Sequence, residues 1–177
     1  MLFKELQTDR LLLKNISSDD REFIFSQFSD NVVNRYLFDA EPLINVQGAD
    51  NIIEFYLQPE PRLQHRWVLV RKEDGIRIGT CGFHCWNMND NTCDVGYDLK
   101  EIYWGKGYMA EAMETIISFA YEQMNLKKIN ACIYVDNGRS IKLAEKLGFK
   151  FNGETQMVSF RGKVYEHKIF TLDLGIL

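Results

Sequence analysis

The segment at residues 103–110, YWGKGYMA, has the residue types and spacing of an anion-binding turn. Gly105 and Gly107 flank Lys106, and an amphipathic helix is expected to follow them. A glycine-rich turn at a helix N-terminus directs unpaired backbone N–H groups toward one point, where the helix dipole also favours negative charge. The segment therefore predicts a site for a phosphate-bearing ligand. A glycine turn that binds nothing is the simpler alternative.

Residues 105–110 also satisfy the loose G-x-G-x-x-[GA] pattern of dinucleotide-binding proteins. That pattern opens a parallel βαβ unit and is followed by an acidic residue about 20 positions later. Here antiparallel strands are expected before the glycines, and Asp136 comes too late in the chain. A P-loop is excluded as well, because no Gly-Lys-Ser/Thr follows.

The elements around this segment indicate a mixed α/β sheet in a single domain that spans residues 1–177. Alternating apolar residues predict strands at 10–14, 66–71, 77–86, 92–99, 129–135, 149–154 and 164–174. Helical spacing predicts a helix after the capping residues 17–20, a short helix at 32–38, and further helices at 49–57, 110–124 and around 141–147. The strands from 66 to 99 form an antiparallel meander, and the later strands are linked by helices.

Composition argues against several classes of partner. The 21 basic and 25 acidic residues give a net charge of −4, which is a poor match for a nucleic-acid backbone. Residues 1–10 contain four charged side chains and lack the apolar segment of a signal peptide, and no apolar run approaches the roughly 20 residues of a membrane span. We therefore expect a cytoplasmic protein with no nucleic-acid or membrane partner.

Four potential zinc ligands lie close together in the sequence, at Cys81, His84, Cys85 and Cys93. A regular strand would place Cys81 and Cys85 on the face of Phe83 and His84 on the other face. The chain has no CxxC pair, and its four cysteines are too irregularly spaced for a disulfide framework. The sequence thus predicts buried thiols that act as small apolar residues, and no metal.

Several motifs follow one another in an order that resembles a known family. They are TDRLLL at 8–13, IGTCGF at 78–83, DVGY at 94–97, the glycine segment, NGRS at 137–140 and LGF at 147–149. Over nearly the whole chain they resemble the GNAT superfamily of N-acetyltransferases, in the branch of ribosomal-protein N-terminal acetyltransferases (RimJ/RimL type). Three positions depart from the usual pattern: Lys14 replaces arginine, Trp104 replaces glutamine or arginine, and Met109 replaces glycine or alanine.

The resemblance implies a GNAT-like acyl-CoA N-acyltransferase fold with acetyl-CoA as cosubstrate and no metal. The pantetheine arm would lie between strands 94–99 and 129–135, which splay apart, and backbone N–H groups of residues 105–110 would bind the pyrophosphate. Asn137 would bind the pantetheine or cap the following helix. The implied cofactor-binding residues are Tyr97, Asp98, Leu99, Trp104, Gly105, Lys106, Gly107, Tyr108, Met109, Ala110, Asn137 and Ser140.

Acetyl transfer to an amine requires a neutral amine, a stabilised oxyanion and a protonated thiolate leaving group. By resemblance, Asp94 occupies the position of the base and would act through water or orient the amine, while His84 is the other candidate. The backbone N–H near Tyr97 would stabilise the oxyanion. Many relatives carry a tyrosine that acts as the acid where this chain has Ala144. The resemblance to the ribosomal-protein branch, in which a serine at the position of Ser140 is the proposed acid, implies that Ser140 donates the proton to the thiolate.

The predicted function is acetyl-CoA-dependent transfer of an acetyl group to a primary amine, either a protein N-terminal α-amine or a small molecule, by direct attack through a tetrahedral intermediate. The alternatives are a noncatalytic acyl-CoA-binding regulatory module and a scaffold that binds no cofactor. We expect a monomer or a homodimer. The amine would bind among residues 38–43, 51–57, Trp86 and 161–167, with Glu41, Glu54 and Glu166 as candidates for attracting an ammonium group.

Overall fold

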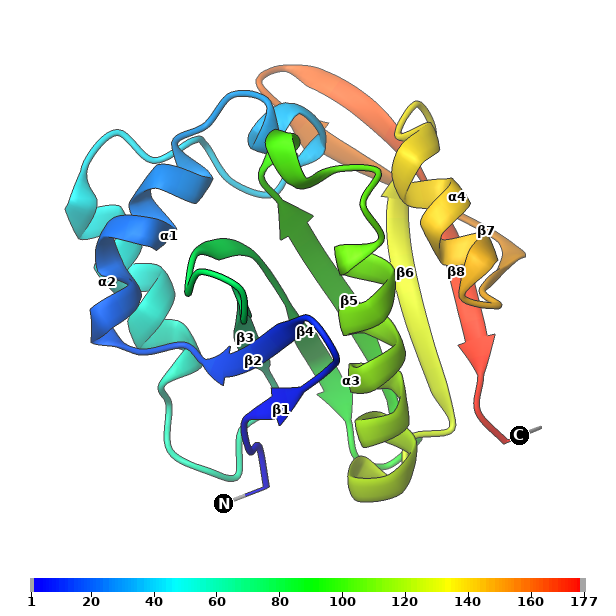
Figure 1. Ribbon diagram of the computed structural model, residues 1–177. Helices are drawn as coiled ribbons and strands as arrows, with labels where there is room; N and C mark the ends of the chain where they lie inside the picture. Colours follow the sequence, from blue (N-terminus) through cyan, green and yellow to red (C-terminus); the bar gives the residue numbers. More distant parts are fainter. Residues whose placement is uncertain (1, 176–177) are drawn as a thin grey trace.

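The computed structural model describes residues 2–175, which form a mixed sheet of eight strands (Figure 1). Met1, Ile176 and Leu177, at the ends of the predicted domain, lie outside the described residues. The strand order is β1-β2-β3-β4-β5-β6-β8-β7, and the β5–β6 pair is parallel while the others are antiparallel. The strands are β1 (Leu6–Gln7), β2 (Leu11–Asn15), β3 (His65–Arg71), β4 (Arg77–Asn87), β5 (Thr92–Leu99), β6 (Lys128–Tyr134), β7 (Lys150–Phe160) and β8 (Lys163–Asp173).

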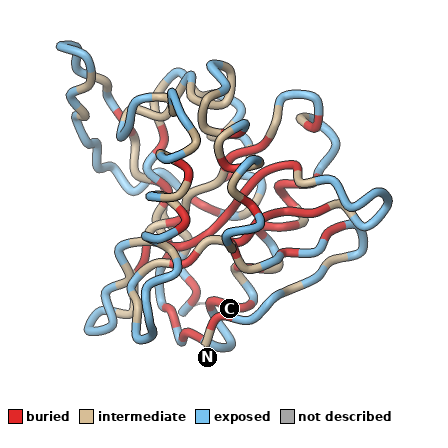
Figure 2. The backbone as a smooth tube through the Cα atoms, turned by 90° about the vertical axis from the view of Figure 1, so that its left-hand side faces the viewer, coloured by how far each residue is buried: buried red, intermediate tan, exposed pale blue. Residues whose placement is uncertain are grey.

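Helices cover both faces of this sheet, and strand alternation divides the core between them. On β3, Trp67 and Leu69 join the core beneath α3 and α4, whereas Val68 and Val70 join the core beneath α1 and α2. Figure 2 shows that buried residues concentrate in the central strands. The helices are α1 (Arg21–Phe28), α2 (Val46–Tyr56), α3 (Tyr108–Met124) and α4 (Gly138–Lys146), with 3₁₀ helices η1 (Ser18–Asp20), η2 (Val33–Tyr36) and η3 (Glu101–Tyr103). None of the helices within residues 2–175 is long and apolar enough to cross a bilayer.

The parallel strands β5 and β6 pair over only a short stretch. Their pairing runs from Thr92 opposite Lys128 to Asp94 opposite Asn130, and then stops. Beyond Asp94, β5 pairs with β4 alone as far as Leu99, while β6 remains paired with β8 throughout. The predicted splay between these two strands is confirmed, and it leaves one edge of the second half of β5 without a neighbouring strand.

Three predicted elements differ from the structure. The expected helix at 32–38 is only the 3₁₀ turn η2, because Leu37 adopts an extended conformation (φ −97°, ψ 107°) and ends the turn after Tyr36. The strand predicted at 149–154 extends to Phe160, past a register shift where Gly153 has φ +91°. The last strand, β8, is inserted between β6 and β7, so β7 is the free edge of the sheet.

Candidate active site

The glycine segment forms a tight turn directly before α3. Gly105 and Gly107 have φ +73° and +82°, backbone angles that favour glycine, and both residues are exposed. Gly107 is the N-terminal cap residue of α3, so the N–H groups of Tyr108, Met109 and Ala110 have no acceptor within the helix. We call residues 105–110 the cradle. Residues 105–107 are exposed, whereas Tyr108 and Met109 are buried against the core. Unpaired N–H groups at the positive end of a helix dipole favour an anion, so the geometry of the cradle is compatible with an anion site.

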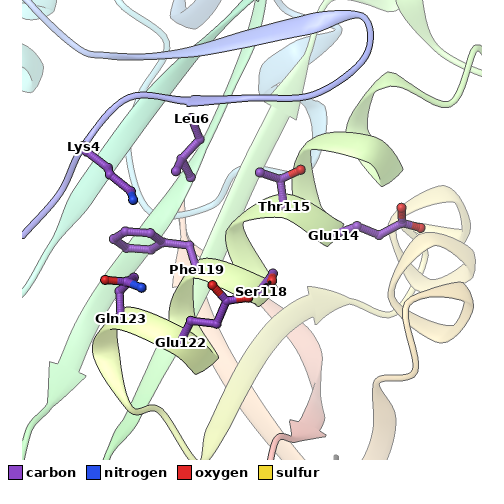
Figure 3. A pocket seen from close by; sticks show the side chains of 8 residues that line it. All are labelled: Lys4, Leu6, Glu114, Thr115, Ser118, Phe119, Glu122 and Gln123. Atoms are coloured by element: carbon purple, nitrogen blue, oxygen red, sulfur yellow. Dashed lines mark hydrogen bonds between the residues drawn. The ribbon is translucent and has the colours of Figure 1, made fainter.

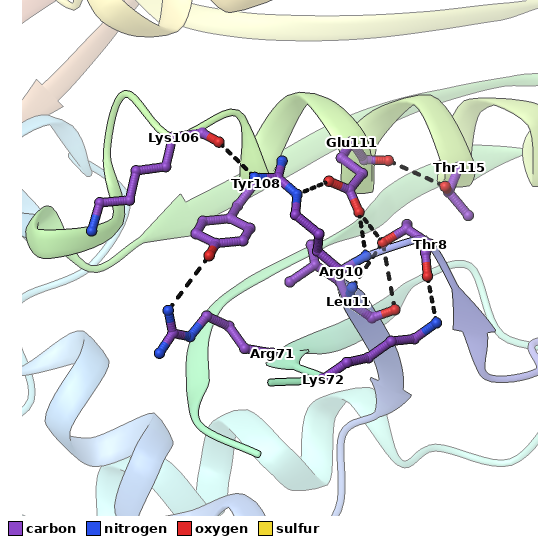
Figure 4. A network of polar contacts seen from close by, with 9 residues as sticks. All are labelled: Thr8, Arg10, Leu11, Arg71, Lys72, Lys106, Tyr108, Glu111 and Thr115. Carbon is purple, nitrogen blue, oxygen red and sulfur yellow. Dashed lines mark hydrogen bonds and ion pairs between the residues drawn. The ribbon is translucent and has the colours of Figure 1, made fainter. Parts of the chain in front are cut away.

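Residues from the start of the chain hold the cradle in place (Figure 4). The Arg10 guanidinium donates to the Lys106 carbonyl at 2.9 Å and to the Glu111 carboxylate at 2.6 Å. Glu111 also accepts the backbone N–H of Arg10 at 2.9 Å and the Thr8 hydroxyl. Partial burial opposes ionisation of Glu111, but these hydrogen bonds outweigh it and lower the pKa of the carboxyl. Sequence reasoning matched Thr8 and Arg10 to a strand motif and missed this positioning role.

Trp104 connects the cradle to both sides of the splayed strands. Its indole N–H donates to the Leu99 carbonyl at the end of β5, 2.8 Å away. Its ring faces the guanidinium carbon of Arg139 on α4 at 4.1 Å. The Lys106 ammonium lies over the Tyr103 ring at 5.6 Å. Trp104 thus packs between β5 and α4. The Leu99 carbonyl already accepts a hydrogen bond from it.

Tyr97 and Ser140 face each other across the gap between β5 and α4. The Tyr97 hydroxyl and Ser140 Oγ are 2.7 Å apart, and either can donate. The Asn137 carboxamide accepts the Ser140 N–H at 3.2 Å, so Asn137 caps α4, one of its two predicted roles. Burial raises the pKa of Tyr97, and the Ser140 hydrogen bond offsets this only in part, so the phenol stays protonated. Sequence reasoning assigned Tyr97 a backbone role and missed its hydroxyl.

The two candidate bases, Asp94 and His84, lie directly opposite each other on β5 and β4. Both are half-buried. Asn130, the partner of Asp94 on β6, donates to the Asp94 carboxylate at 3.5 Å. Burial lowers the pKa of His84, although the charges of Asp94 and Asp39 oppose the shift. The imidazole is therefore neutral at pH 7 and able to accept a proton.

The Asp98 side chain lies away from the splayed gap. Its carboxylate accepts hydrogen bonds from Gln27 of α1 at 2.7 Å and from Thr80 of β4, and Arg66 lies 3.9 Å away. Burial raises the pKa of Asp98 despite these partners. Asp98 therefore connects β5 to α1, and only its backbone is available toward a ligand in the gap.

The four cysteines divide into two pairs. Cys81 and Cys93 are buried in the core, as predicted for apolar thiols, whereas Cys85 and Cys132 are exposed. The prediction that Cys85 shares the face of Cys81 is wrong, because Cys85 has φ +53° and lies where the β4–β5 register shifts. The four ligands considered from the sequence are not assembled in the structure.

An aromatic cluster joins the loop before α2 to the last strands of the sheet. Phe38 stacks on Tyr165 of β8 with ring centroids 3.9 Å apart, and meets the edge of Tyr134 of β6 at 5.0 Å. Arg161, in the β7–β8 turn, forms an ion pair with Glu41. Two of the segments predicted to bind the amine, 38–43 and 161–167, are thus in contact.

The other predicted acceptor residues are not part of this surface. Trp86 meets the edge of Phe3 at 6.4 Å and packs against the core beneath α3. Helix α2 uses Ala49 and Ile53 to pack against α1 and β3, and its Glu54 is exposed. Glu166 is also exposed. The sequence alone did not indicate which of the predicted acceptor residues would lie near Phe38.

A shallow groove of about 390 Å³ runs along the outer side of α3, away from the cradle (Figure 3). Its lining includes Glu114 and Glu122, whose carboxylates would repel a phosphate-bearing ligand. The groove therefore does not compete with the cradle as an anion site.

Residues 10–150 match the family model of the GNAT acetyltransferase domain. The chain belongs to the GNAT acetyltransferase family. Over 97% of both chains, this GNAT acetyltransferase is 29% identical to YoaA of Bacillus subtilis, which is described as an uncharacterised N-acetyltransferase. The family identified from the motif order is thus confirmed, and the protein is an acetyltransferase.

Solved structures confirm the predicted fold. Spermidine N-acetyltransferase from Vibrio cholerae, in complex with CoA and spermine, superposes with a TM-score of 0.82 at 18% identity, over 93% of this chain and 96% of that one. Ribosomal-protein-S5-alanine acetyltransferase from Vibrio fischeri gives a TM-score of 0.80 at 22% identity, over 97% of both chains. At these identities the two structures establish the GNAT fold of this acetyltransferase.

Proposed function

We propose that this acetyltransferase moves the acetyl group of acetyl-CoA to a primary amine, by one direct attack through a tetrahedral intermediate. The observation that carries the proposal is the cradle at the start of α3, beside the gap where β5 and β6 splay apart. An anion site next to an unpaired strand edge fits a ligand with a pyrophosphate and an extended amide-bearing arm. The structural relative bound to CoA supports this choice.

In this proposal the cradle binds the pyrophosphate through its backbone N–H groups. Gly105 leaves space there, since a Cβ on it would meet no atom within 4 Å, whereas a Cβ on Gly107 would lie 3.3 Å from the Arg10 guanidinium. The pantetheine arm lies along β5 at Tyr97–Leu99, with Trp104 beside the cradle. Asn137 contributes by capping α4 and so positions Ser140.

Acid and base roles follow from the side chains at the gap. Asp94 and neutral His84, opposite each other, orient the amine and take its proton, directly or through water. A backbone N–H near Tyr97 stabilises the oxyanion. Ser140 donates a proton to the departing thiolate, and the Tyr97 hydroxyl, 2.7 Å away, positions Ser140 and resupplies the proton.

For the acceptor, we propose an amine that approaches between the Phe38 cluster and β5. Two proteins with this fold are named for their acceptors, spermidine in one case and the alanine of a ribosomal protein in the other. Both acceptors carry a primary amine. The resemblance to the RimJ/RimL branch favours a protein N-terminus. The exposed free thiols of Cys85 and Cys132 fit the reducing cytoplasm.

Calorimetric titration with acetyl-CoA and with CoA tests the cofactor site. In Gly107→Asp a carboxylate enters the cradle at a residue with φ +82°, so we expect micromolar binding to be lost. Gly153→Asp is the matched control, because Gly153 has φ +91°, has no atom within 4 Å of an added Cβ, and lies on the edge strand β7. Absence of binding by the folded wild type would overturn the proposal.

An acetyl-transfer assay distinguishes an enzyme from the noncatalytic acyl-CoA-binding module. Acetyl transfer from acetyl-CoA is measured with a polyamine and with short peptides that carry a free α-amine. Turnover of the peptides above that of the polyamine is the expected result. Tight acetyl-CoA binding with no transfer to either class of amine would favour the regulatory module.

A further inference from the structure

Three different donor atoms meet where β4 and β5 face the proposed amine site. They are an imidazole nitrogen of His84, Sγ of Cys85 and a carboxylate oxygen of Asp94, and all lie within 4.8 Å of one another. Cys85 is exposed, while His84 and Asp94 are half-buried. The group is therefore accessible from solvent.

A β-bulge brings Cys85 to the side of His84. Neighbouring side chains on a regular strand point to opposite faces, which would separate these two donors. Instead, Cys85 adopts φ +53°, and the pairing of β4 with β5 shifts register between His84 and Asn87. A left-handed conformation is unusual for a residue other than glycine, and bulges commonly redirect a side chain next to a functional site.

The closeness of all three donors distinguishes a metal site from a nucleophilic relay. In a Cys–His–Asp relay the imidazole stands between thiol and carboxylate, which separates sulfur from oxygen by roughly 7 Å. Here that separation is within 4.8 Å. Tetrahedral zinc ligands lie roughly 3.5 Å from one another, so modest side-chain rotation is enough to bind an ion.

The charges around the three donors are compatible with a cation. Asp39 is close enough for its negative charge to act on His84. Arg66 is a positive group acting on the same imidazole, and its guanidinium lies 3.9 Å from the Asp98 carboxylate. A Cys85 thiolate and the Asp94 carboxylate together balance a divalent ion.

We infer that His84, Cys85 and Asp94 form a binding site for a divalent cation of borderline softness such as Zn²⁺, with a fourth position open to solvent. On binding, Cys85 releases its thiol proton to solvent. The bound ion coordinates the Asp94 carboxylate, which the proposed function assigns to the amine. The ion therefore competes with the amine and inhibits acetyl transfer. This inhibition rests on the proposed function, whereas the binding does not.

Cobalt titration of the reduced full chain tests the site without any activity measurement. Co²⁺ bound to a thiolate in a tetrahedral site produces charge-transfer and visible absorption bands. We expect these bands to saturate at one equivalent and to disappear when Zn²⁺ is added. Cys85→Ser removes the charge-transfer band, and Asp94→Asn weakens binding by more than the roughly 10- to 100-fold loss typical of an outer-shell partner.

Cys132→Ser is the matched control, because Cys132 is the other exposed cysteine. Its Sγ lies 3.5 Å from the Gln156 side-chain oxygen and is not one of the three donors. The bands persist in this variant. Absence of the bands in the wild type, survival of the charge-transfer band in Cys85→Ser or loss of the bands in Cys132→Ser would overturn the inference.

Kinetics separate this inference from the proposed function. With an amine that is turned over, Zn²⁺ raises the KM for the amine and leaves the KM for acetyl-CoA unchanged. An increase in the KM for acetyl-CoA instead overturns the assigned inhibition. If no amine is turned over, the proposed function fails, while the cobalt bands still decide whether the metal site exists.

Discussion

The cradle presents backbone N–H groups from one short segment, whereas the surface around Phe38 presents side chains from three distant parts of the chain. Cradle geometry depends on Gly105 and Gly107 and on a helix start, which are local features. The Phe38 surface depends on contacts with Tyr134 and Tyr165. We call the cradle the cofactor half of the site and the surface around Phe38 the acceptor half. In the proposed function the cofactor half binds through backbone groups and the acceptor half through side chains. Substitutions in the acceptor half would therefore change the choice of amine without loss of cofactor binding.

The largest expected effect is at Ser140, which faces Tyr97 across the gap between β5 and α4. Ser140→Ala removes the proposed proton donor, and general acid catalysis contributes about 10²–10⁴-fold. We therefore expect kcat to fall about 100-fold or more while the Kd for acetyl-CoA is unchanged, measured by single-turnover kinetics and calorimetry. Ser118→Ala, on the exposed side of α3, is the control. An unchanged single-turnover rate in Ser140→Ala would refute the assignment.

Arg10→Ala affects the cofactor half alone. Loss of its hydrogen bonds to Lys106 and Glu111 frees the cradle, and we expect acetyl-CoA to bind about tenfold more weakly, or about 1.4 kcal/mol. The KM for the amine stays constant. Arg21→Ala is a matched control, because Arg21 forms an equally short ion pair, 2.6 Å, with Asp50 between α1 and α2. Equal effects of the two variants on binding would contradict a specific role for Arg10.

Phe38→Ala is the corresponding test of the acceptor half. An aromatic pair contributes about 0.5–1.5 kcal/mol beyond its buried area, so loss of stacking on Tyr165 predicts a roughly 3- to 10-fold higher KM for the amine. The Kd for acetyl-CoA does not change. Phe55→Ala, an exposed aromatic residue on α2, serves as the control. A higher Kd for acetyl-CoA in Phe38→Ala would show that the halves are not independent.

Glu111→Gln gives the smallest effect and reports on the charge that holds the cradle. The folded-state pKa of Glu111 is below its ordinary value of 4.5, so its stabilisation is fully present above that pH and is lost as the pH falls through the folded-state pKa. Thermal unfolding at pH 7 should show the variant less stable by about 1 kcal/mol. This difference should shrink as the pH falls below 4.5. A difference that is constant with pH would exclude an ionic contribution.

Local features of this chain were predictable from the sequence. Strand β5 has the predicted bounds, Thr92–Leu99, because apolar residues alternate along it between clear turns. The cradle was also predictable, since glycine spacing before an amphipathic helix is a local signal. Capping of α4 was one of the two roles that the sequence predicted for Asn137, and the structure shows it.

Features that join distant residues were not predictable in the same way. The Arg10–Glu111 contact spans 101 positions, and no periodicity marks it. The insertion of β8 between β6 and β7 depends on how whole strands pair. The bulge at Cys85 was missed because a single residue with positive φ reverses the alternation on which the strand prediction relied. The structural role of Trp104 was hidden because its partners, Leu99 and Arg139, come from different elements.

The contact between Arg10 and the cradle also determines when the anion site can exist during synthesis. Arg10 leaves the ribosome early and has no carboxylate partner until Glu111 follows it. The cradle is therefore held only in chains in which β2 has docked against α3. A ligand that binds the cradle would bind these chains and not the unfolded ones, and so would stabilise the folded protein.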